Sequence, residues 1–214
     1  MFRQILRELE KHVFFTGFGA VTGIVVMVFF HGLPSKVSHN IFYTLHPIHV
    51  LLSAFATASM YRLHKNPDKC NVWILLFIGY IGSVGIATLS DSVIPYLGEV
   101  MLDMPDRAIH IGFIEKWWLV NPLAILGIAM AYFRPSTRFP HAGHVLLSTW
   151  ASLFHIIMAS GQTLNWFSYV AVFLFLFLAV WIPCCLSDIA FPLLFVKGPS
   201  SWLWQKQNHD VVSR

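Results

Sequence analysis

The stretch that decides the fold class is residues 13–30, VFFTGFGAVTGIVVMVFF, which contains no charged side chain. An α-helix of this length is about 27 Å long, close to the ~30 Å hydrocarbon thickness of a bilayer. Five further stretches are free or nearly free of charge, at residues 40–61, 71–90, 117–133, 141–161 and 166–195. Backbone groups in lipid must be paired within their own segment, so each stretch should be a helix. The sequence therefore predicts an all-α polytopic membrane protein, a bundle of six transmembrane helices.

The composition of the chain supports this class. Of the 214 residues, 57% are hydrophobic and only 11% are charged. A soluble domain carries about 25% charged residues, so a soluble globular enzyme is excluded. The net charge of +4 comes from basic residues in short loops between apolar stretches, and no nucleic-acid partner is expected. The expected partner is the lipid bilayer, and a homo-oligomer or a larger membrane complex is compatible with the sequence.

The distribution of basic residues predicts the orientation. With the N-terminus in the cytoplasm, 11 of the 14 Lys and Arg residues fall on the inner side, and only Lys36, Arg107 and Lys116 fall outside. This asymmetry predicts that both termini are cytoplasmic, in a plasma or inner membrane. We expect three parts: a basic amphipathic lead over residues 1–12, a six-helix transmembrane domain over 13–196 and a cytoplasmic tail over 197–214.

Histidine is the unusual residue in these spans. The chain has 11 His residues, and an ionisable group inside a membrane span marks a functional site by default. We estimated the depth of each ionisable residue from its position along its predicted span. One set of these residues lies at a similar depth in the outer half of the bundle. Asp91 is expected just after the third span, at its outer end. The full set is His46, His49, Asp91, His110, Glu115 and His155.

This set predicts a transition-metal site. His46 and His49 are three residues apart and share one face of a helix, so both imidazoles can reach one ion. Imidazole and carboxylate ligands suit Zn, Fe, Ni, Mn or Cu ions. Pro47 lies between the two histidines and indicates either a helix start or a kink. We expect His46, His49 and His155 to converge with Asp91.

A second set of candidate ligands lies nearer the inner side: His144, Cys184, Cys185 and Asp188. Thiols there would suit softer ions. Pro183 removes a backbone hydrogen bond, so the last span is expected to bend near Ala179.

Four functions are compatible with these residues. Metal-ion transport is preferred, with the outer and inner sets as successive sites. A membrane metalloenzyme would use a metal-activated water with Asp91 or Glu115 as general base. A haem b electron carrier would use His49 and His155 as axial ligands, and His64 with His141 or His144 for an inner haem. The fourth is a structural subunit of a membrane complex.

Overall fold

The computed structural model describes residues 2–30, 32–65, 70–136, 138–161 and 165–196. For residues 2–12, 138–141, 185, 188 and 189 it describes the backbone only. Every regular element in these ranges is a helix, which confirms the all-α prediction. The predicted tail, residues 197–214, lies outside the described residues.

The helices form long rods. The first two are α1 (Phe2–Phe30) and α2 (Ser35–His64), and the fifth is α8 (Arg138–Ala159). The third rod joins α3 (Val72–Tyr80), α4 (Ile86–Thr88) and α5 (Ile94–Met101) through the π-helical segments η2 (Ile81–Gly85) and η3 (Leu89–Val93). The short helix α6 (Gly112–Glu115) precedes α7 (Trp117–Phe133). The last rod joins α9 (Trp166–Cys185), η4 (Leu186–Ala190) and α10 (Phe191–Leu194).

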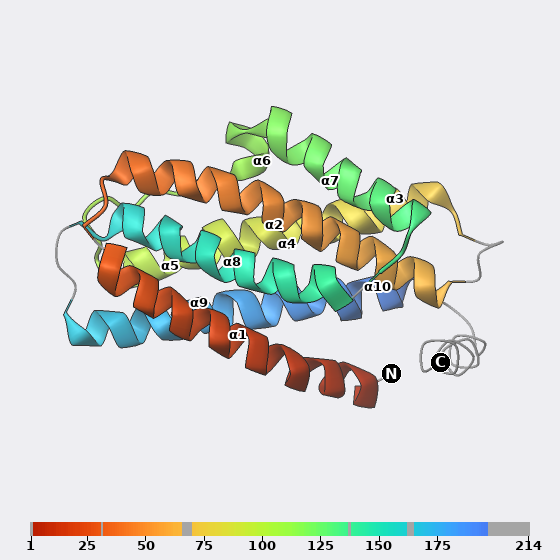
Figure 1. Cartoon of the computed structure of the whole chain (residues 1–214), viewed down its shortest axis with the longest axis horizontal. Helices are drawn as coiled ribbons and strands as arrows, with labels where there is room; N and C mark the ends of the chain where they lie inside the picture. Colours follow the sequence, from red (N-terminus) through yellow and green to blue (C-terminus); the bar gives the residue numbers. More distant parts are fainter. Residues whose placement is uncertain (1, 31, 66–69, 137, 162–164, 197–214) are drawn as a thin grey trace.

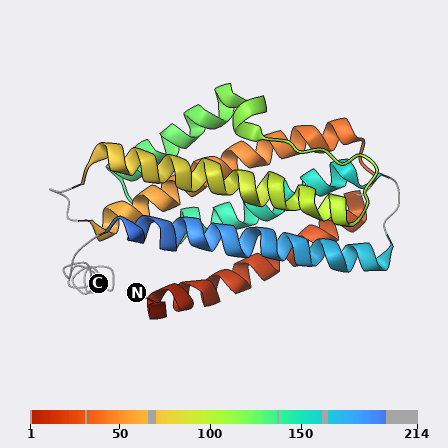
Figure 2. The same cartoon turned by 180° about the vertical axis from the view of Figure 1, so that it is seen from behind.

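Five of these rods are long and apolar enough to cross a membrane, and α7 is a shorter apolar helix of 17 residues. The chain is thus a polytopic helical membrane protein. α2 and α8 are mostly buried and pack against one another in the middle of the bundle (Figures 1 and 2). α1 and α9 expose large apolar side chains, among them Phe14, Phe29, Phe167 and Val170. Such a surface is suited to hydrocarbon, because water would not solvate it.

One end of the bundle carries residues 32–34, the 102–111 connection and the C-terminal end of α8 (left in Figure 1). We call it the outer end, following the predicted orientation. From there the 102–111 connection runs back along the bundle, so α6 lies beside α2 some way in from this end (Figures 1 and 2). This return places the side chains of α6 against the outer half of α2.

Two predicted features of the spans are corrected. The third span does not end at residue 90, because residues 94–101 are apolar apart from Glu99 and the helix continues to Met101. α2 begins at Ser35, so Pro47 is neither its start nor its end but lies inside it. The last rod stays helical through Pro183 and changes to π-helix at residues 186–190. The π-helical segment therefore follows the proline, and the bend near Ala179 stays a prediction.

The orientation can be tested by cysteine labelling. In a background with Cys70, Cys184 and Cys185 replaced by Ser, a membrane-impermeant maleimide should label Asp103→Cys in intact cells. The same reagent should label Ser136→Cys only after the membrane is permeabilised. Asp103 and Ser136 are both exposed and lie at opposite ends of the bundle. The opposite labelling pattern would reverse the orientation.

Candidate metal centre

Asp91 is the centre of a buried polar cluster formed by α2, η3 and α8. Its Oδ2 atom lies 2.9 Å from Nδ1 of His46 and 2.6 Å from Nδ1 of His49. The exposed fraction of each of these three residues is 1% or less. One ligand atom from each residue lies within 4.8 Å of those of the other two, so the three can hold one metal ion. We call them the buried site.

Serine side chains hold the other oxygen of the same carboxylate. The hydroxyls of Ser90 and Ser148 each donate to Asp91 Oδ1 at 2.7 Å. Ser152, one turn along α8, donates to the carbonyl of Ser90 at 2.9 Å. Both oxygens of Asp91 are therefore fixed, which orients the carboxylate toward the two imidazoles.

The π-helical segment η3 explains how three consecutive polar residues become buried. Ser90, Asp91 and Ser92 are all 0% exposed and all lie in η3. π-helical turns are rare and are often found at functional sites. A π-helical turn contains one more residue than an α-helical turn. The eight-residue step from Asp91 to Glu99 therefore rotates about the helix axis by roughly as much as seven residues of α-helix, which is about two full turns. Both carboxylates consequently face the interior of the bundle.

His155 does not join the buried site, which corrects the predicted set. Its Nδ1 lies 2.6 Å from Oε1 of Glu99, and both residues are buried. Glu99 follows Asp91 by eight residues in a helical rod that continues to Met101, so Glu99 lies about 12 Å nearer the outer end. His155 likewise follows Ser148 by two turns, which brings it level with Glu99. The prediction set Asp91 at the outer end of the third span, and it therefore set His155 at the depth of Asp91 and not at the depth of Glu99.

Glu99 is the main site residue that was not predicted, because it falls between the predicted spans at residues 71–90 and 117–133. It is fully buried, and its Oε2 atom has no hydrogen-bond partner among the residues that the structure describes. The signal available in the sequence was the apolar run on either side of Glu99, which continues the helix past Asp91. Its partner His155 also accepts a hydrogen bond from the backbone N–H of His110 at 3.4 Å.

His110 and Glu115 belong to a third group, with His39 of α2. Ligand atoms of these three residues also lie within 4.8 Å of one another, and all three are partly exposed. We call them the outer cluster. Partial burial raises the pKa of the Glu115 carboxyl, but a hydrogen bond from Tyr43 and the nearby His110 lower it by more, leaving the pKa below its usual range. Glu115 is therefore ionised at neutral pH.

Phe42 separates the buried site from the groups nearer the outer end. Its ring stacks on His46 at a centroid distance of 5.3 Å and meets His155 edge-on at 5.4 Å. Phe42 is 0% exposed, so its ring fills the space between the two imidazoles.

The imidazole of His46 is also confined by Gly112 of α6. A Cβ atom added at Gly112 would collide with the ring of His46. Gly112→Ala is therefore expected to displace His46 and weaken metal binding by about 10-fold or more, as loss of ligand positioning does elsewhere. Gly32→Ala is the control, since nothing lies within 4 Å of a Cβ there. Equal zinc affinities of the two variants, measured by calorimetry, would contradict the positioning role of Gly112.

The inner candidates do not form a separate described site. His144 stacks on His49 at 5.7 Å, and the Sγ atom of Cys184 lies 3.9 Å from the Ser148 hydroxyl, so both adjoin the buried site. The side chains of Cys185, Asp188 and His141 lie outside the described part of the structure. His64 lies at the inner end, with Nδ1 2.9 Å from the carbonyl oxygen of Met60 in its own helix.

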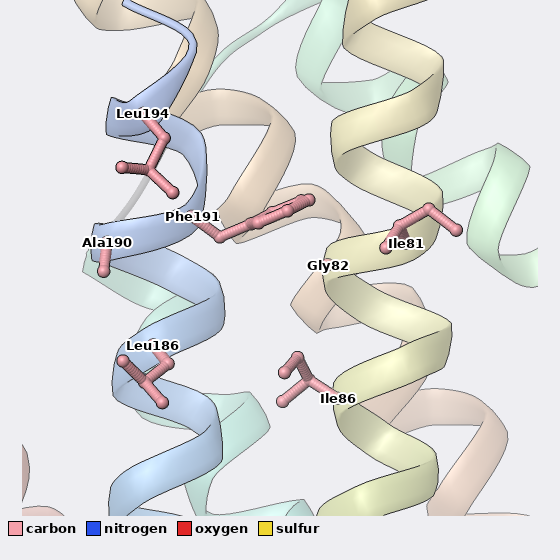
Figure 3. Close-up of a pocket in the computed structure, with 7 residues that line it drawn as sticks. All are labelled: Ile81, Gly82, Ile86, Leu186, Ala190, Phe191 and Leu194. Carbon is pink, nitrogen blue, oxygen red and sulfur yellow. The ribbon is translucent and has the colours of Figure 1, made fainter.

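A surface groove between the η2–α4 and η4–α10 segments is not a candidate for ion binding. It is lined by Ile81, Gly82, Ile86, Leu186, Ala190, Phe191 and Leu194 (Figure 3). None of these side chains offers a metal ligand.

Comparison with protein-family models, curated proteins and solved structures finds no match to this chain. Its function must be inferred from the geometry of these side chains.

Proposed function

We propose that this protein binds a divalent transition-metal ion at His46, His49 and Asp91 and conducts it across the membrane. The observation that carries the proposal is a fully buried set of two imidazoles and one carboxylate inside a transmembrane bundle. An ionisable cluster at this depth is costly, and transport pathways are where membrane proteins usually keep one.

The donor set fits such an ion. Two imidazoles and a carboxylate are ligands accepted by Zn²⁺, Fe²⁺, Ni²⁺, Mn²⁺ and Cu²⁺. The Ser90 and Ser148 hydroxyls are the supporting partners that metal-binding carboxylates require.

Buried hydroxyl groups continue inward from the buried site along α2. Thr57 Oγ1 lies 3.2 Å from Ser187 Oγ, whose hydroxyl donates to the carbonyl of Gly82. Both residues are 0% exposed. Oxygen donors on the inner side of the bundle could receive an ion that leaves the buried site, which favours passage over permanent binding.

The same geometry favours a small ion over the other functions. A metalloenzyme must admit a substrate to its metal, whereas each residue of the buried site is at most 1% exposed. A haem would need His49 and His155 on one iron, but these residues pair with Asp91 and Glu99, about 12 Å apart along the bundle.

A flux assay tests the proposal. The full chain would be reconstituted in liposomes that contain a fluorescent zinc chelator, and zinc would be added outside. Wild-type protein should give saturable uptake, and His49→Ala should lower it by about 10-fold or more. His64→Ala is the matched control, because this imidazole lies away from the buried site. Equal uptake by wild type and His49→Ala would overturn the proposal.

Binding should also depend on pH. A histidine must be neutral to bind a metal, so protons compete with the ion for the imidazole nitrogens. Zinc affinity of the purified protein should therefore fall as the pH is lowered from about 7 to about 5. An affinity that does not change across this interval, measured by competition with a chelator of known pH dependence, would contradict imidazole ligation.

A further inference from the structure

We propose that His39, His110 and Glu115 form a second transition-metal site, which loads the buried site from the outer end. The loading role rests on the proposed function, whereas metal binding by the outer cluster can be tested independently of it. Neither composition nor spacing indicated His39, because it lies before the predicted start of its span.

Three separate segments bring these ligands together. His39 lies in the second turn of α2, His110 lies near the end of the 102–111 connection, and Glu115 ends α6. The rings of His39 and His110 are 5.6 Å apart, and Nδ1 of His110 lies 3.4 Å from Oε2 of Glu115. Two imidazoles and one carboxylate with partial exposure leave coordination positions open to water, as in exchangeable zinc sites.

The second oxygen of Glu115 and its neighbours keep the carboxylate in place. Glu115 Oε1 accepts a hydrogen bond from the backbone N–H of Ile111 at 3.1 Å, and Oε2 accepts one from the Tyr43 hydroxyl at 2.5 Å. The ammonium group of Lys116 lies over the Tyr43 ring, 5.5 Å from its centre. This positive charge opposes cation binding, so the site should be weak enough to release its ion.

The outer cluster is continuous with the buried site through three aromatic contacts. The rings of His110 and His155 are 5.4 Å apart, and the ring of Phe42 lies against both His155 and His46. The carboxylate of Glu99 is fully buried and lies beside His155 on this line, and its Oε2 atom finds no hydrogen-bond partner in the described part of the chain. An ion released by the outer cluster thus has one carboxylate and one imidazole ahead of it before it reaches Phe42.

The test is the zinc stoichiometry of the full chain, purified in detergent after removal of any polyhistidine tag. Wild type should bind two zinc ions of different affinity. His39→Ala and Glu115→Gln should each lose the weaker ion and keep the tighter one. Asp91→Asn should lose the tighter ion only, and the double variant His39→Ala/Asp91→Asn should bind none. Lys116→Gln should strengthen the weaker site severalfold, and His64→Ala should leave both unchanged.

The outcomes separate this inference from the proposed function. If His39→Ala and Glu115→Gln both bind zinc like wild type, the second site is wrong whatever Asp91→Asn shows. If they lose one ion while Asp91→Asn loses none, the second site stands and the buried site fails. The two outer variants replace partly exposed side chains, so the result does not depend on whether the buried variant folds.

Discussion

Replacing Asp91 with Asn is expected to lower zinc affinity at the buried site by more than about 100-fold, since loss of a merely supporting partner costs 10- to 100-fold. The carboxylate faces two imidazoles and two hydroxyls, and it supplies the only formal negative charge of the buried site. Asn has nearly the same shape, and its amide oxygen can still accept hydrogen bonds from the serines, so the loss reports the missing charge and the missing ligand oxygen. Titration calorimetry in detergent measures it.

Asp103→Asn provides the matched control for this substitution. Asp103 is exposed at the outer end and pairs with Arg107 at 2.7 Å, so the same chemical change there should leave zinc affinity unaltered. A decrease of only 10- to 100-fold for Asp91→Asn would indicate that Asp91 orients the histidines without binding the ion. An unchanged affinity would remove Asp91 from the site altogether.

The largest effect on stability is expected from Gly127→Ala. Gly127 lies in α7 where this helix meets α2, and an added Cβ would collide with the backbone carbonyl oxygen of Leu51 and crowd Ala54. A backbone atom within a helix cannot move aside as a side chain can. The free energy of unfolding should therefore fall by about 1–3 kcal/mol or more. Thermal unfolding in detergent should show a transition lower by several degrees.

Gly85→Ala is the control for that substitution. Gly85 also lies in a membrane-spanning rod, but a Cβ there would meet nothing within 4 Å. Its unfolding temperature should match or exceed that of wild type, because Ala loses less backbone entropy on folding than Gly does. If both variants unfold at the same temperature, the close approach of α7 to α2 is wrong.

The helices themselves could be predicted from sequence, because backbone N–H and C=O groups in lipid must be hydrogen-bonded within their own apolar segment. The ends of most spans fall within a few residues of the predicted ones, as at Trp117, Phe133 and Trp166. The third span was cut short at residue 90, since Ser90, Asp91 and Ser92 resemble the polar end of a helix. In the structure these residues lie inside the bundle because η3 turns all three away from lipid.

The grouping of the ionisable residues could not be derived from depth arithmetic alone. The pairing of His46 and His49 follows from their spacing, and the structure places both on Asp91. Assigning His155 to Glu99 requires the two additional turns of helix after Asp91, which the sequence analysis had treated as a loop. His110 and Glu115 approach His39 only because the 102–111 connection runs back along the bundle, and no local pattern encodes that return.

The most direct test of the buried metal site is zinc K-edge X-ray absorption on the His39→Ala variant, in which the buried site is the one expected to be filled. The spectrum should show nitrogen and oxygen ligands at about 2.0–2.1 Å and the outer-shell scattering of two imidazoles. The same signal should be lost in the His39→Ala/His49→Ala variant. Zinc surrounded by sulfur at about 2.3 Å, or a folded His39→Ala protein that retains no zinc, would contradict the account.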